Sequence, residues 1–137
     1  MKTYDRKITM EVDPDHVFDF VSEPRNLPQF LPTVEYAEKL EDDRIRIKGK
    51  SHGHAYDSEG FFRVDRHKRY VEWGTEGDRA YSGWLQIREG DATNLASEIE
   101  MQLMFAQPPD GDREAILAEM EQTLQAIRDY FLRPAHR

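Results

Sequence analysis

Residues 93–133 decide the fold and read TNLASEIEMQLMFAQPPDGDREAILAEMEQTLQAIRDYFLR. Apolar and polar side chains alternate over residues 95–105, which is typical of a β-strand with one covered face and one wet face. The sequence PPDG at 108–111 ends the strand. Asp112 can cap a helix, which we expect to end before Pro134. The stretch therefore predicts a long strand followed by a long C-terminal helix.

The predicted C-terminal helix is amphipathic. Its apolar residues fall three and four positions apart and form one stripe, with glutamate, glutamine and aspartate outside it. A stripe of this width needs a partner surface. Its members are Leu117, Met120, Leu124, Ile127 and Phe131, and the residues outside it include Glu119, Gln122, Gln125 and Asp129.

The N-terminal third begins with a second alternating segment, residues 2–12, which also predicts a half-buried strand. It stops at Asp13 and Pro14, which suit the cap and the first position of a helix. We expect a short helix there and another short helical turn between Pro24 and Pro32. Turn residues then separate six further strands, at approximately 33–41, 43–53, 56–66, 69–76, 80–90 and 93–107.

This order of elements predicts an α+β fold, in which a curved antiparallel sheet of seven strands grips the long helix. One face of the sheet is wet, so the helix must cover the other face. A single helix is only about 10 Å wide and does not fill the trough of so broad a sheet. We therefore expect an apolar cavity between them, of the kind that binds small molecules.

Composition excludes several classes of function. The net charge of −8 disfavours a nucleic-acid partner, because phosphate backbones are bound by a basic face. The absence of cysteine excludes disulfides, thiol catalysis and thiolate metal sites. No run of apolar residues approaches the roughly 20 of a membrane span, and no signal region follows the first residues. We expect a cytoplasmic protein.

Residues 8–21, ITMEVDPDHVFDFV, resemble the N-terminal signature of the START-like, helix-grip (SRPBCC) superfamily. Residues 24–32, PRNLPQFLP, resemble its second short helix, and Val71-Glu72-Trp73 fits as well. The superfamily includes the polyketide cyclase/dehydrase group and the birch-pollen allergens. The resemblance implies one helix-grip domain over residues 1–137. It leaves the function open among lipid carriers, hormone receptors, cyclases and co-chaperones, and it supplies no family-wide catalytic motif.

Strand and helix periodicity indicates which side chains face the cavity. A wall of aromatic residues, methionines and serines suits a flat or flexible apolar ligand with a few oxygens. We therefore predict binding or transport of a small hydrophobic molecule, such as a lipid, an isoprenoid or a polyketide, without a cofactor. The competing interpretation is that these side chains simply fill the core. The predicted ligand-binding residues are Tyr36, Ser58, Phe62, Trp73, Tyr81, Met101, Met120 and Leu124.

Two other functions are open. A cyclase or dehydratase would need a buried acid–base group, for which Glu38 and the tyrosines Tyr36, Tyr56 and Tyr81 are candidates. A protein-interaction module of the toxin-like or co-chaperone branches would have a filled core and a functional outer surface. His52-Gly53-His54 has the spacing of two metal ligands, but without a third ligand nearby it is better explained as a turn.

The outer face of the sheet carries a further hypothesis. The alternation that sends Trp73 inward sends Phe61, Tyr70 and Trp84 outward on neighbouring strands. A cluster of exposed aromatic residues suits a self-complementary homodimer interface. Alternatively, a β-bulge buries Trp84, or arginine side chains stack on it. The basic residues of strand 43–53 alternate and are expected to be solvated; they are Arg44, Arg46, Lys48 and Lys50.

Overall fold

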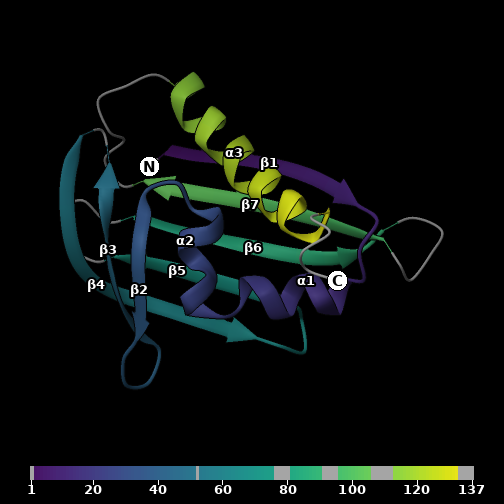
Figure 1. Ribbon diagram of the computed structural model, residues 1–137, viewed down its shortest axis with the longest axis horizontal. Coiled ribbons are helices and arrows are strands. Elements are labelled where there is room, and N and C mark those ends of the chain that lie inside the picture. Colours follow the sequence, from purple (N-terminus) through teal and green to yellow (C-terminus); the bar gives the residue numbers. More distant parts are fainter. Residues whose placement is uncertain (1, 52, 76–80, 91–95, 106–112, 133–137) are drawn as a thin grey trace.

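The alternating stretch and the amphipathic stretch near the C-terminus form a strand and a helix packed on each other in the computed structural model (Figure 1). The structure describes residues 2–51, 53–75, 81–90, 96–105 and 113–132. The strands are β1 (Lys2–Met10), β2 (Val34–Lys39), β3 (Arg44–Ser51), β4 (His54–Asp65), β5 (Tyr70–Thr75), β6 (Tyr81–Glu89) and β7 (Ser97–Phe105). The helices are α1 (Pro14–Val21), the 3₁₀ turn η1 (Pro24–Asn26), α2 (Leu27–Phe30) and α3 (Arg113–Leu132).

Within the described residues, seven strands form one antiparallel sheet in the order β1-β7-β6-β5-β4-β3-β2. The sheet curves, and all the helices lie on its concave side (Figure 1). Helix α3 packs along β1, α1 packs on β6 and β7, and α2 lies between β2 and α3. The predicted α+β helix-grip fold is confirmed. The cap predicted at Asp112 lies outside the described residues.

Local chemistry explains how α1 begins and how it is held. The Asp13 carboxylate accepts a hydrogen bond from the Asp15 backbone N–H at 2.8 Å, and Pro14 occupies the first turn. From the turn between β4 and β5, Arg69 pairs with Asp15 and Arg66 pairs with Asp19, each at 2.8 Å. These two ion pairs tie α1 to the far end of the β4–β5 hairpin.

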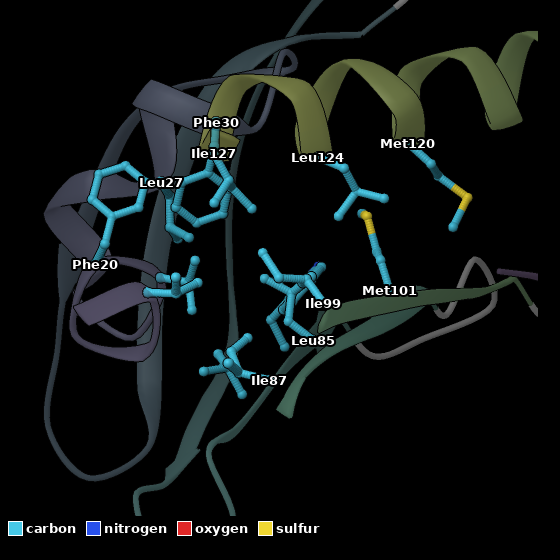
Figure 2. Close-up of a cluster of buried hydrophobic side chains, with 14 of the residues drawn as sticks. Phe20, Leu27, Phe30, Leu85, Ile87, Ile99, Met101, Met120, Leu124 and Ile127 are labelled. Atoms are coloured by element: carbon cyan, nitrogen blue, oxygen red, sulfur yellow. The ribbon is translucent and has the colours of Figure 1, made fainter. Parts of the chain in front are cut away.

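The core lies between α3 and the central strands (Figure 2). Leu124 and Met120 point from α3 towards Met101 of β7, with Leu85 and Ile99 beside it. The predicted stripe of α3 is therefore on the correct side. Its buried face also includes Ile116 and Thr123, which the sequence pattern had left out. None of the helices in the described part of the chain is both long enough and apolar enough to span a membrane.

Candidate ligand-binding site

Trp73 and Tyr81 form a polar pair on the apolar concave face. The indole Nε1 of Trp73 on β5 donates a hydrogen bond to the hydroxyl oxygen of Tyr81 on β6, at 3.0 Å. Trp73 is only 7% exposed, and Tyr81 is half-buried. Gly83 pairs with Trp73 across the two strands, and a Cβ there would lie 2.7 Å from the indole ring. The glycine therefore lets the indole lie close to the sheet.

The Tyr81 hydroxyl is neutral and oriented. Burial raises its pKa to about 12, the hydrogen bond from Trp73 opposes that rise, and the charges of Tyr56 and Glu119 add to it. Because the oxygen accepts from Trp73, the hydroxyl proton points elsewhere. Within the described part of the chain, no group accepts a hydrogen bond from this proton. The Tyr81 hydroxyl can therefore donate a hydrogen bond to an oxygen of a bound ligand.

Two other hydroxyls near the concave face, those of Tyr56 and Ser97, already donate to backbone carbonyls. Tyr56 donates to the backbone carbonyl of Thr33 at 2.7 Å, and burial is the main cause of its raised pKa. Ser97 is fully buried and donates to the carbonyl of Val12. Ser58 is half-buried on β4, opposite Ile47 of β3. Unlike Tyr56 and Ser97, Tyr81 therefore keeps its proton for an external acceptor, while its oxygen is held by Trp73.

Five of the other predicted wall residues do face the concave side. They share a face through the strand registers, in which Phe62 pairs with Trp73 and Leu85 pairs with Met101. Met101, Met120 and Leu124 are almost completely buried and point towards one another (Figure 2). That these side chains line a ligand cavity remains a prediction. The five residues are Phe62, Trp73, Met101, Met120 and Leu124.

The prediction that Tyr36 belongs to this wall is wrong. The register of β2 against β3 shifts between Val34 and Tyr36, so that Glu35 is accommodated as an extra residue. After this bulge Ala37 points inward, and Tyr36 lies on the outer face, 45% exposed. There its hydroxyl donates to Glu38 at 3.0 Å, and Lys48 stands over its ring.

The alternative acid–base group and the histidine motif do not form a site either. Glu38 is exposed on the same outer face as Tyr36, away from the concave side. His54 is exposed at the start of β4, and His52 lies outside the described residues. In the part of the chain that the structure describes, no three histidine or acidic side chains are grouped to hold a metal ion.

On the outer face the aromatic residues lie where the alternation predicted, and each is half-buried. Tyr70 and Trp84 have ring centroids 6.0 Å apart, and Trp84 Nε1 donates to Gln102 at 3.0 Å. Arg63 stacks over Phe61 at 4.5 Å, so the arginine contact falls on Phe61 instead of Trp84. Of the basic residues of β3, Arg44 pairs with Glu59 at 3.3 Å and Arg46 with Asp57 at 2.8 Å. Arg44, Lys48 and Lys50 are exposed, as predicted, and Arg46 is half-buried.

Two features of the concave side were missed from the sequence. Glu119 of α3 was placed outside the apolar stripe, but it is half-buried and close enough to Tyr81 to raise its pKa. A pocket of about 200 Å³ also opens between η1 and β4. Helical periodicity could have placed Glu119 at the edge of the buried face of α3, because this residue is next to Met120 and lies one turn before Thr123. The pocket depends on how three separate segments meet.

Comparison with known proteins identifies the family. Residues 10–126 match the family model described as polyketide cyclase / dehydrase and lipid transport, and the chain belongs to this family. No curated protein matches the sequence.

Solved structures share the fold at low sequence identity. Zhui aromatase/cyclase from Streptomyces sp. R1128 is 15% identical over 98% of this chain and 97% of its own, with a TM-score of 0.77. A START superfamily protein from Mycobacterium smegmatis is 13% identical over 93% and 95%, with a TM-score of 0.72. The di-domain ARO/CYC BexL of the BE-7585A biosynthetic pathway is 18% identical over 94% of this chain, with a TM-score of 0.74. This chain spans 46% of BexL.

Proposed function

We propose that this protein binds a small, mostly apolar molecule on the concave face of the sheet, with Tyr81 donating a hydrogen bond to one ligand oxygen. The observation that carries the proposal is the oriented, neutral Tyr81 hydroxyl, held by Trp73 Nε1 at 3.0 Å in an apolar wall. Apolar sites that bind small molecules typically carry a few fixed polar groups of this kind.

The surrounding side chains favour a flat or flexible ligand. Trp73 and Phe62 offer aromatic surface, while Met101 and Met120 are unbranched and can re-pack around different shapes. Glu119 and Tyr56 disfavour a negative charge next to Tyr81. The expected ligand therefore presents a carbonyl or hydroxyl oxygen, as polyketides, isoprenoids and many lipids do. The family description, which joins polyketide chemistry with lipid transport, supports this class.

Native mass spectrometry of freshly purified protein tests the proposal. We expect a co-purified apolar molecule on the wild type and a reduced occupancy on Tyr81→Phe. Tyr36→Phe is the matched control, because it makes the same change on the outer face. Equal occupancy on all three proteins would mean that Tyr81 does not hold the ligand.

A cyclase function is the second candidate, and it depends on the proximity of Glu119 to Tyr81. In this mechanism Glu119 takes a proton from the carbon next to a ligand carbonyl, while Tyr81 stabilises the enolate oxygen. The carbanion then attacks a second carbonyl carbon of the same ligand molecule and closes a ring, and the resulting alkoxide takes back the proton that Glu119 had removed. The aromatase/cyclases with solved structures of the same fold support this candidate.

The two functions are separated by Glu119→Gln. If the protein is a cyclase, this variant should bind a poly-β-ketone model compound but lose its conversion to the cyclised product. If the wild type binds the compound without converting it, the binding function stands and the cyclase function fails.

A further inference from the structure

A second concave site lies at the opposite edge of the structure from the α3–β1 contact. Its volume is about 200 Å³, and it is bounded by the residues after α1, the end of β2, the β2–β3 turn and the inner face of β4. Helix α1 packs on β6 and β7 and α2 packs on β2, which leaves this part of β4 uncovered. The lining residues are Ser22, Pro24, Lys39, Asp43, Arg44, Phe62 and Val64.

The floor of this site is apolar and open. Val64 is on the inner face of β4, opposite the buried Val71, yet it is 42% exposed. Phe62, two residues earlier on the same face, forms the inner wall and is nearly buried. An exposed aliphatic side chain at the bottom of a concavity is a surface that gains free energy when an apolar group covers it.

The rim of the site has one uncompensated positive charge. Asp43 pairs with Arg63 at 3.9 Å, and Arg44 pairs with Glu59 at 3.3 Å. Both partners lie on the outer face of the sheet. For Lys39 no ion pair is present in the part of the chain that the structure describes. Its ammonium group is therefore the charge that a ligand in this site would meet.

We propose that this site binds a small aromatic carboxylate, with the ring on Val64 and Phe62 and the carboxylate on Lys39. The size is suitable, because an apolar cavity of roughly 150 Å³ holds a benzene molecule, and the site measures about 200 Å³. The site therefore has room for a single ring with one carboxylate, whereas a long lipid or a polyketide chain would extend beyond it into solvent.

This site is separate from the one around Tyr81. Phe62 stands between them, since its side chain lines the second site and it pairs with Trp73 across β4 and β5. Phe62 contributes to both sites, whereas Tyr81, Trp73 and Glu119 do not line the second one. A ligand can therefore bind at Lys39 and Val64 whether or not one binds at Tyr81.

Amide and methyl NMR spectra recorded during a benzoate titration test the inference. We expect saturable shifts at Ser22, Lys39, Arg44 and Val64. Benzyl alcohol, which lacks the charge, should bind more weakly. Lys39→Gln should weaken benzoate binding about fivefold, the ratio expected for one exposed charge contact. Lys7→Gln is the matched control, because Lys7 is exposed on β1.

Val64→Asp provides a second variant, which places a negative charge on the floor of the site. It should abolish benzoate binding while leaving the rest of the amide spectrum in place, because Val64 is largely solvent-accessible. Shifts confined to Trp73, Tyr81 and Met120 would overturn the inference and favour the site around Tyr81. Shifts that are equal in Lys39→Gln and wild type would also overturn it.

Discussion

Gly83 lies directly beneath the indole of Trp73, so closely that a single added methyl group would stand 2.7 Å from the ring. It would also stand 2.7 Å from a methyl group of Leu103. The indole is in turn the donor that orients Tyr81. A small backbone position on β6 thus sets the position of the polar pair.

We therefore predict that Gly83→Ala displaces the indole and lowers the free energy of unfolding by about 1–3 kcal/mol, as overpacking of a core typically does. Chemical denaturation measures this change, and tryptophan fluorescence reports the altered environment of Trp73. Ser82→Ala on the opposite face is the control. If Gly83→Ala had wild-type stability and fluorescence, the close contact would not exist in solution.

The second prediction concerns alkaline pH. Burial raises the pKa of Tyr81 from 10.0 to about 12 in the folded protein. Between these two values the unfolded chain loses the phenol proton and the folded protein keeps it, so stability decreases as the pH rises. Each unit corresponds to about 1.36 kcal/mol, which makes about 3 kcal/mol an upper bound for the total.

Denaturation at a series of alkaline pH values should show this loss, and Tyr81→Phe should reduce it. The absorbance of tyrosinate should show one tyrosine in the wild type that titrates later than all the others, and Tyr81→Phe should lack it. A variant that retains the late titration would assign it to another tyrosine.

Trp73→Ala should weaken the binding of an apolar probe dye far more than it changes the secondary structure. The reason is that an aromatic wall residue supplies contact area to a ligand. Dye fluorescence measures the affinity, and far-ultraviolet circular dichroism measures the secondary structure. An unfolded variant would instead show that Trp73 is a core residue, because a large-to-small change in a packed core costs about 3–5 kcal/mol.

Self-association through the outer face is the fourth prediction. Tyr70 and Trp84 lie side by side there, with Phe61 on the neighbouring β4. We propose that two copies pair through these rings about a two-fold axis, and that Trp84→Glu weakens the dimer. Sedimentation equilibrium measures both proteins. A wild type that stays monomeric at high micromolar concentration would exclude the dimer.

The strands and helices could be predicted from the sequence because each has a consistent period. The alternation that ends at Phe105 and the helical stripe through Met120 and Leu124 each repeat over many residues, so single exceptions do not change the assignment. The placement of Trp73 and Tyr81 on neighbouring strands followed from the same periodicity. Their hydrogen bond did not, because it depends on side-chain rotamers.

Tyr36 and Glu38 were assigned to the wrong face of the sheet for a different reason. Tyr36 and Glu38 lie after a bulge of one residue, and a shift of one position turns every following side chain of a strand to the other face. The site around Lys39 and Val64 has no local pattern at all, because it arises where η1 and α2 stop short of β4.

The sheet order also constrains how the chain assembles. β1 and β2 are consecutive in the sequence but occupy opposite edges of the sheet, and β1 pairs with β7, where Ile8 lies opposite Ile99. During synthesis the first strand therefore has no neighbouring strand until β7, residues 97–105, has been made. The β2–β7 meander can form from hairpins of adjacent strands, whereas closing β1 onto it carries the entropy cost of a long loop. We expect β1 to dock last, together with α3. The backbone amides of β1 should therefore be the last to become protected from hydrogen exchange during refolding.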